Sequence, residues 1–288
     1  MVLVERDELT DWQADSPQHT PPPRTYTSKA LSESELRAVT EAANRVQQNS
    51  FAHDGYVELI NLLHLGLLSH IRLQSTLQSS GDPRSYELLR DLQAARESMS
   101  SRFAMGEILW ADWVQDQILL AVSFEDKIAV RELCERAVGE EDTSSTLWLI
   151  YGQWMQSEYS RLGALEERTN GARSKHNQLM SEEERAMAAE FFGRQQVHDV
   201  WQRGAQKTTL RINDSHQIWD PYLDILLQDL ETSPTPKAIS SLRQRYMDRL
   251  QTPHATWDNT SSKLSTFISS YDNQNWEMTM VSVLEQCF

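Results

Sequence analysis

The sequence is poor in the two residues that make most turns. Its 288 residues include 10 Gly and 9 Pro, whereas a fold of many short strands needs turn residues at frequent intervals. No segment alternates polar and apolar residues for long enough to predict a strand. These absences favour an all-α fold, and a hydrophobic content of 39% gives a chain of this length a sizeable core.

Cysteine is also scarce. Cys134 and Cys287 lie far apart, and neither belongs to a CxxC or Cys/His pattern. The sequence therefore predicts neither a disulfide framework nor a zinc site. We interpret both residues as small buried hydrophobic side chains.

Long apolar runs are missing as well. The longest apolar stretch, residues 56–73, is interrupted by polar residues along its length, which favours a buried helix over a membrane span. Glu5, Asp7 and Glu8 stand where a secretory signal would have a basic region. We expect an intracellular protein without membrane contact.

Positive charge is in the minority. There are 27 Lys and Arg against 42 Asp and Glu, which gives a net charge of -15. Because nucleic-acid affinity depends on clustered Lys and Arg, the chain is not expected to be the main phosphate-binding surface of a complex. Protein partners are expected instead. The sequence does not exclude a local basic patch on one face of the protein.

The common catalytic motifs are absent. The sequence has no Gly-rich phosphate loop, no G-x-S-x-G elbow and no H-E-x-x-H motif. His64 and His70 are six residues apart, a spacing that does not place them on one helix face as i, i+4 would. We predict no catalytic, cofactor-binding or metal-binding residue, and hence no enzyme.

Several segments carry signals for the start of a helix. A Ser followed three residues later by Glu forms a capping box, and Thr before Pro places an N-cap ahead of the first helical position. These starts are Ser32 with Glu35, Ser181 with Glu184, and Thr235 with Pro236. Residues 1–30 lack a helical period and are expected to form a flexible arm, in which Trp12 is an isolated aromatic residue.

Tryptophans mark an internal repeat. Trp110, Trp148, Trp219 and Trp257 each open an amphipathic segment, at intervals of 38, 71 and 38 residues. The two equal intervals match a repeat of paired helices, and the middle one predicts a repeat lengthened by an insertion. Further large apolar side chains follow at i+3 and i+6, such as Tyr151 and Trp154 after Trp148, which predicts a buried aromatic stripe.

A second type of helix alternates with the aromatic helices. It occupies residues 128–138, 197–205 and 242–250 and has Arg near its end, followed by Ala directly in the first and after one Gly in the second. This W-x-x-Y helix followed by an Arg-Ala helix resembles the HAT (half-a-TPR) repeat. The resemblance implies a right-handed α-solenoid of antiparallel helix pairs over residues 31–288.

We assign about five repeat units, of which the third has an insertion and the last is incomplete. The units are residues 51–105, 106–140, 142–210, 215–254 and the segment from 255 onward. The insertion, residues 160–180, is polar and is expected to be a solvated loop, with a partner-specific protrusion as the alternative.

Three stretches narrow the resemblance to one family. Residues 56–63, 108–113 and 147–153 look like the first HAT repeats of the U4/U6 snRNP recycling factors. That resemblance implies a nuclear scaffold in pre-mRNA splicing whose partners are proteins of the U6 or U4/U6 snRNP. It also implies that RNA contact by this segment is secondary. A homodimer is compatible with the resemblance.

The family joins these repeats to downstream RNA-recognition motifs. None occurs before Cys287 and Phe288, where the sequence stops inside an unfinished helix pair, so we expect a fragment of a longer polypeptide. Two alternatives remain: a HAT scaffold in mRNA 3′-end processing or ribosome biogenesis, and a helical-repeat subunit of a prenyltransferase-like enzyme.

Overall fold

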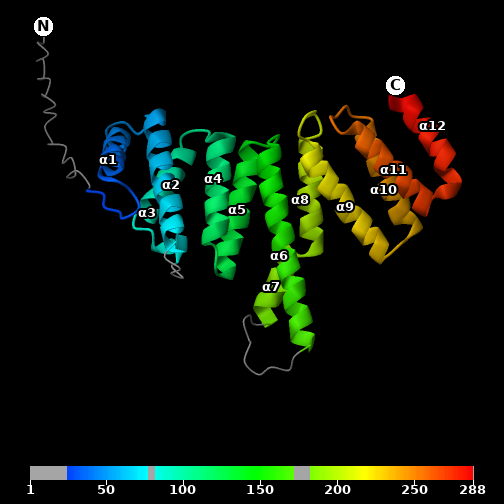
Figure 1. Ribbon diagram of the computed structural model, residues 1–288, viewed down its shortest axis with the longest axis horizontal. Coiled ribbons are helices and arrows are strands. Elements are labelled where there is room, and N and C mark those ends of the chain that lie inside the picture. Colours follow the sequence, from blue (N-terminus) through cyan, green and yellow to red (C-terminus); the bar gives the residue numbers. More distant parts are fainter. Residues whose placement is uncertain (1–24, 77–81, 172–181, 288) are drawn as a thin grey trace, which may run out of the picture. The chain divides into compact units, whose positions relative to one another are not determined.

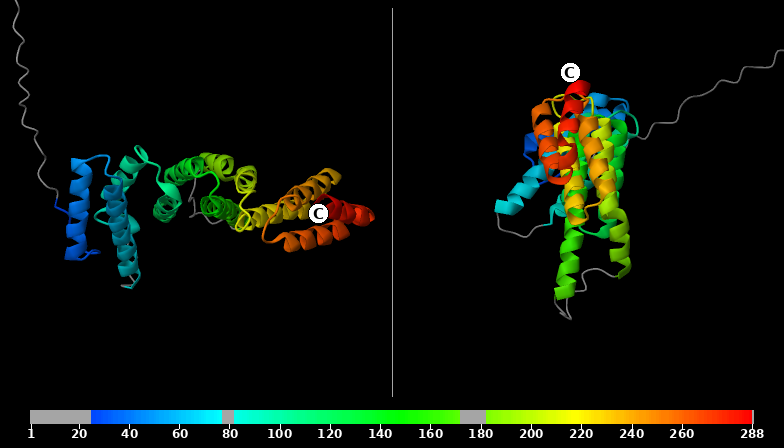
Figure 2. Two further views of the ribbon diagram at one scale, coloured as in Figure 1. Left: turned by 90° about the horizontal axis from the view of Figure 1, so that it is seen from above. Right: turned by 90° about the vertical axis from the view of Figure 1, so that its right-hand side faces the viewer.

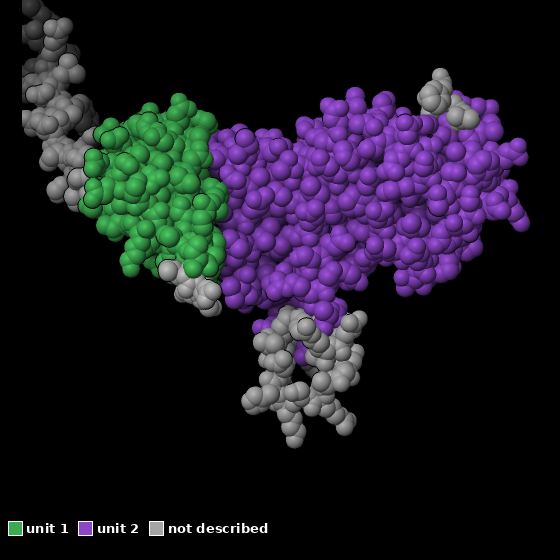
Figure 3. All heavy atoms as spheres, in the orientation of Figure 1, with its two compact units in different colours: residues 1–95 green, residues 96–288 purple. Residues whose placement is uncertain are grey.

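The computed structural model describes residues 25–76, 82–171 and 182–287. All regular structure in these residues is helical, and they contain no strand. The chain divides into two compact units, residues 1–95 and residues 96–288 (Figure 3). The predicted all-α fold is confirmed.

The first unit is built around one helical hairpin. It contains α1 (Glu33–Gln48), α2 (His53–Thr76), the short 3-10 helix η1 (Pro83–Ser85) and the start of α3 (Leu89–Ser100). α1 begins at the predicted capping box, because the Ser32 hydroxyl accepts from the Glu35 N–H and the Glu35 carboxylate accepts from the Ser32 N–H. α1 packs against α2.

α2 is the helix predicted from the longest apolar stretch. It buries Tyr56, Ile60, Leu63 and Leu67 along one stripe, at the spacing of an amphipathic helix. In the described part of the chain, no helix is long and apolar enough to span a membrane. The interpretation of residues 56–73 as a buried helix is therefore confirmed.

The second unit is a row of helices that pack in chain order (Figure 1; Figure 2). Its helices are α4 (Gly106–Leu120), α5 (Phe124–Glu140), α6 (Ser145–Gly171), α7 (Glu182–Phe192), α8 (Arg194–Lys207), α9 (His216–Thr232), α10 (Pro236–Leu250), α11 (Trp257–Tyr271), η2 (Asn273–Asn275) and α12 (Trp276–Cys287). The aromatic helices α4 and α6 also pack against each other, as do α6 and α9. This consecutive packing of helix on helix is the predicted repeat architecture.

The aromatic stripe forms the core, as predicted. Trp110, Trp148 and Trp219 are at most 6% exposed. The rings of Trp110 and Trp113 stack with their centroids 5.3 Å apart, and Trp148 stacks on Tyr151 at 6.3 Å. These three tryptophans therefore contribute to packing and are not available as a platform for stacking bases.

The segment at Trp257 departs from this pattern, as the sequence indicated. Trp257 is the first residue of α11 and is only partly buried. Thr260, which stands where an aromatic residue was expected, is buried with its hydroxyl 2.9 Å from the ring of His254. A polar pair thus replaces an aromatic contact at this point.

A close approach of two helices depends on Gly152. A Cβ atom at this position would lie 2.6 Å from the indole ring of Trp201, which is 1% exposed. Non-bonded carbon atoms pack at about 3.5–4.0 Å, so only glycine at this position allows α6 and α8 to pack this closely.

The predicted loop at residues 160–180 is wrong in its first half. α6 continues as one helix of 27 residues to Gly171, so residues 160–171 are helical, and residues 172–181 lie outside the described chain. Leu, Ala, Glu and Arg in residues 160–168 are good helix formers. The loop was predicted from the polar composition of the segment, which does not distinguish a loop from a solvated helix. α7 packs along α6, and both extend past their neighbours in the second unit (Figure 1).

Other predictions concern helix starts, cysteines and unit boundaries. Thr235 caps α10 ahead of Pro236, as predicted, whereas Ser181 and Trp12 lie outside the described residues. Cys134 is buried, as predicted, and the side chain of Cys287 is not described. The division into five units stays a prediction, and α2, which opens the first of them, packs against the preceding α1.

Candidate interaction surface

Arginines of the second-type helices lie over the tryptophans of the aromatic helices. Each guanidinium carbon is 5.1–5.6 Å from the centre of an indole ring, a distance at which a cation is attracted to the face of the ring. The pairs are Arg136 over Trp110 and Trp113, Arg203 over Trp148, and Arg249 over Trp219. The sequence placed both residue types in the repeat but did not indicate that they touch.

Two of these arginines are also held by carboxylates. Arg136 donates two hydrogen bonds of 3.0 Å to Glu97, and Arg203 donates to both oxygens of Glu135 at 2.9 and 2.6 Å. Such bidentate pairs fix the orientation of the guanidinium group. Glu97 lies on α3 and Glu135 on α5, so the first pair joins α3 to α5 and the second joins α5 to α8.

Glu135 is the centre of a small network. It also accepts a hydrogen bond of 2.7 Å from the Tyr151 hydroxyl. Burial disfavours the ionised carboxylate, but the hydrogen bonds from Arg203 and Tyr151 outweigh it and keep the pKa of Glu135 below its ordinary value. Burial, together with the bond to Glu135, raises the pKa of Tyr151. The carboxylate therefore stays charged at neutral pH and locks Arg203 in place.

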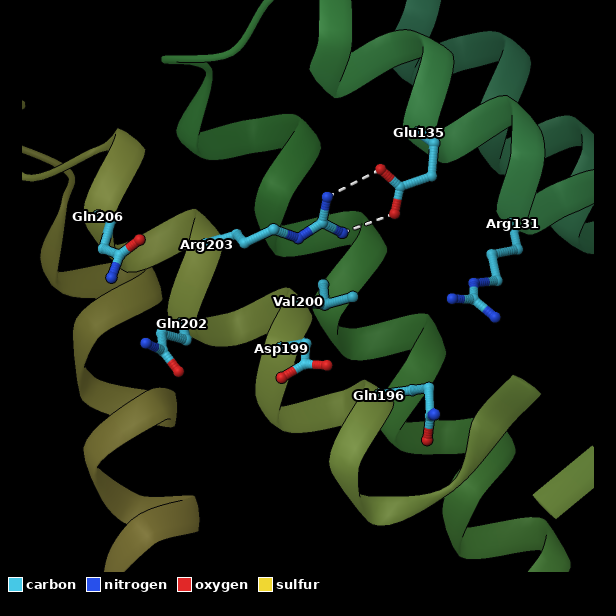
Figure 4. Close-up of a pocket in the computed structure, with 8 residues that line it drawn as sticks. All are labelled: Arg131, Glu135, Gln196, Asp199, Val200, Gln202, Arg203 and Gln206. Atoms are coloured by element: carbon cyan, nitrogen blue, oxygen red, sulfur yellow. Dashed lines mark hydrogen bonds and ion pairs between the residues drawn. The ribbon is translucent and has the colours of Figure 1, made fainter. Parts of the chain in front are cut away.

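A polar groove opens between α5 and α8, both of which pack on α6. It has a volume of about 470 Å³. In Figure 4, Arg203 reaches across it from α8 to Glu135 on α5. The lining residues are Arg131, Glu135, Gln196, Asp199, Val200, Gln202, Arg203 and Gln206.

Three glutamines of α8 line this groove without being used inside the protein. The side-chain amides of Gln196, Gln202 and Gln206 form no hydrogen bond with the part of the chain that the structure describes. Gln202 and Gln206 are one helical turn apart and share a face of α8. Their amides are free to meet an external partner.

Arg131 is oriented by Phe191 and lies near enough to Glu135 for its charge to help lower the pKa of that carboxylate. Its guanidinium donates a hydrogen bond of 3.1 Å to the Phe191 carbonyl and lies 5.4 Å from the centre of the Phe191 ring. Within residues 25–76, 82–171 and 182–287 it has no ion pair within 4.0 Å. The groove thus contains two arginines, two carboxylates and three amides, and its charges balance.

This arrangement suits binding and offers little for catalysis. The lining has no nucleophile and no histidine, and no three His, Cys, Asp or Glu side chains of the described residues are grouped to hold a metal ion. His70 lies beside Gln74 and Ser85 in the first unit and is not part of the groove. The predicted absence of catalytic and metal-binding residues stays a prediction.

No protein-family model matches the chain. Over 210 residues, or 73% of this chain, it is 26% identical to a Mus musculus protein described as spliceosome associated factor 3, U4/U6 recycling protein. Proteins of the same description from Pongo abelii and Homo sapiens are each 24% identical over 210 residues. The match spans 16% of the length of each relative. The resemblance predicted from the repeat motifs is confirmed: in sequence, this chain is similar to spliceosome-associated U4/U6 recycling proteins over 73% of its length.

Proposed function

We propose that this chain is a protein-binding scaffold in pre-mRNA splicing and serves the assembly and recycling of the U4/U6 snRNP. The observation that carries the proposal is its similarity to proteins described as U4/U6 recycling proteins. The stacked helices support a scaffold role, since such arrays bind partners along extended surfaces. The groove between α5 and α8 offers binding groups and no reactive side chain.

The proposal places the protein in the nucleus, among proteins of the U6 or U4/U6 snRNP. Contact with RNA by this segment is secondary, because a net charge of -15 repels phosphate and the groove has two carboxylates that balance its two arginines. RNA would then reach the complex mainly through other components.

Affinity purification of the full chain from nuclear extract tests this proposal. The bound proteins are identified by mass spectrometry and the bound RNA by sequencing, with and without RNase treatment. We expect U6 or U4/U6 snRNP proteins, and we expect a fraction of them to remain after RNase because the contact is between proteins.

Three outcomes decide the proposal. Recovery of snRNP proteins that resists RNase supports it. Loss of all snRNP proteins after RNase shows that RNA mediates the association and contradicts a protein scaffold. Exclusive recovery of 3′-end cleavage factors contradicts the role in splicing.

A further inference from the structure

We propose that Ser233 is a modification site, at which a proline-directed Ser/Thr protein kinase transfers a phosphoryl group from ATP. Ser233 begins the short loop between α9 and α10 (Figure 1). In the reaction, the Ser233 Oγ atom bonds to the γ-phosphorus of ATP, the bond from that phosphorus to ADP breaks, and the hydroxyl proton passes to the catalytic aspartate of the kinase. The inference goes beyond the proposed scaffold function and does not depend on it.

The loop has the sequence that such a kinase requires. Residues 233–236 read Ser-Pro-Thr-Pro, so a proline directly follows each of two hydroxyl residues. Proline has no backbone N–H and a fixed φ angle, and a proline-directed kinase recognises it in an apolar pocket. Residues 231–237 are all exposed, so an enzyme can reach the loop from solvent.

The backbone of the loop is already extended. A residue before proline is restricted to extended conformations. The φ angle is -143° at Ser233 and -125° at Thr235, and neither residue is helical. Kinases bind their substrates as extended segments, and a segment that already has its bound conformation costs less free energy to bind. The acceptor and the positions after it therefore need little rearrangement.

The fold leaves the hydroxyl of Ser233 unused. Ser233 is the C-cap of α9, but the cap contact is made by its backbone N–H, which donates to the Asp229 carbonyl. Its side chain forms no hydrogen bond with the described part of the chain. The Oγ atom is therefore free to react without the loss of a structural contact.

Two other hydroxyl residues before proline in the described chain are engaged by the fold. Thr235 caps α10, because its Oγ1 atom accepts a hydrogen bond of 3.2 Å from the Ala238 N–H. Thr252 is half-buried, and its carbonyl oxygen lies 2.7 Å from Nδ1 of His254. A phosphate on either threonine would disturb these contacts, so Ser233 is the preferred acceptor.

A phosphate on Ser233 would act on the end of α9. It adds a charge of about -1.5 to -2 at neutral pH. The carbonyl groups at a helix C-terminus carry partial negative charge, and Glu231 lies two residues before Ser233. We expect this repulsion to loosen the last turn of α9, residues 229–232, and to leave the rest of the array unchanged.

Phosphorylation of the purified full chain by a cyclin-dependent kinase and ATP tests the inference, with tandem mass spectrometry to locate the phosphate. A peptide substrate of the same kinase in a parallel reaction shows that the enzyme is active. The test variant is Pro234→Ala, which keeps the Ser233 hydroxyl and removes the proline after it. The matched control is Pro236→Ala, which removes the proline after Thr235.

We expect Ser233 to carry more phosphate than Thr235 or Thr252. The initial rate at Ser233 should fall about tenfold or more in Pro234→Ala, the size of a lost apolar contact in a specificity pocket, and it should stay unchanged in Pro236→Ala. No phosphate on Ser233 while the peptide is phosphorylated, or equal rates in Pro234→Ala and the unmodified chain, overturns the inference.

Hydrogen exchange of the phosphorylated and unphosphorylated chain tests the effect on α9. Backbone amides of residues 229–233 should exchange faster in the phosphorylated form, because local opening of this turn becomes easier. Equal exchange in both forms overturns this part of the inference. Because both experiments contain only the purified chain and a kinase, their failure is separate from a failure to recover snRNP proteins from extract.

Discussion

The arginine–tryptophan contacts at α5 and α8 are built differently from the one at α10. The side chains of Arg136 and Arg203 are 44% and 45% exposed and each binds a glutamate, whereas Arg249 is 1% exposed and donates to the Ser215 hydroxyl at 2.9 Å. Burial lowers the pKa of Arg249 to about 10.

The tryptophans of these contacts differ in the same way. The indole N–H groups of Trp110 and Trp148 donate to Glu140 and to the Asp142 carbonyl. The N–H of Trp219 and one terminal nitrogen of Arg249 are buried without a hydrogen-bond partner among the described residues.

This difference teaches that one sequence motif can be stabilised in two ways. In α5, Glu135 directly precedes Arg136, and its carboxylate accepts hydrogen bonds from Arg203 of α8. α8 has Gln202 at the corresponding place, which cannot form an ion pair with the next arginine. The contact at α10 therefore depends on burial and ring stacking, and the contacts at α5 and α8 also depend on ion pairs at the surface.

The largest effect is expected from removing a central ring. Trp148→Ala should lower the free energy of unfolding by about 3–5 kcal/mol, because it leaves a cavity in the core. Trp219→Ala should cost about 1 kcal/mol less, since no indole hydrogen bond is lost. Denaturant titration measures both values, and an unchanged stability of Trp148→Ala would show that this ring is not in the core.

The next effect concerns the close approach of α6 and α8. Gly152→Ala should destabilise the chain by about 1–3 kcal/mol, because the added methyl group would meet the Trp201 ring at 2.6 Å. Gly139→Ala is the control, since a Cβ there meets nothing within 4 Å. Equal thermal melting of the two variants would contradict the packing at Gly152.

Two arginine variants test the comparison itself. Arg203→Met should cost about 1 kcal/mol, because the surface ion pair with Glu135 is lost. Arg249→Met should cost less than Arg203→Met, because the removed charge is buried and forms no ion pair within 4.0 Å in the described structure, which offsets the lost hydrogen bond to Ser215. Denaturant titration measures the free energy of unfolding of both variants. A larger loss of stability in Arg249→Met than in Arg203→Met would contradict the comparison.

The smallest effect is a dependence on pH near α11. Burial lowers the pKa of His254 below its ordinary value of 6.5, so the unfolded chain binds a proton first as the pH falls. The free energy of unfolding should therefore decrease as the pH drops through 6.5 and level off below the folded-state pKa. In His254→Gln, this decrease in the free energy of unfolding below pH 6.5 should be absent. Identical pH dependence in the variant and the unmodified chain would show that His254 is not its source.

Local signals in the sequence predicted much of the fold. The capping residues Ser32 and Thr235 act on neighbouring N–H groups, so a few adjacent residues specify the start of each helix. The aromatic spacing from Trp148 to Trp154 likewise places the rings on one face of a single helix. These features need no knowledge of the tertiary structure.

The groove depends on contacts that are distant in sequence. Glu135 and Arg203 are 68 residues apart, and neither has a local pattern that names its partner. A weaker signal existed in Gln202 and Gln206, which are four residues apart and share a helix face without contributing to its apolar stripe. The continuation of α6 to Gly171 was missed because a polar composition suits a solvated helix as well as a loop.

Hydrogen exchange of the full chain with and without purified U4/U6 snRNP tests the central claim most directly. The claim is that this array binds snRNP proteins directly. We expect slower exchange of backbone amides in helices of residues 96–288 when the particle is present. No slowing in any helix would contradict the account.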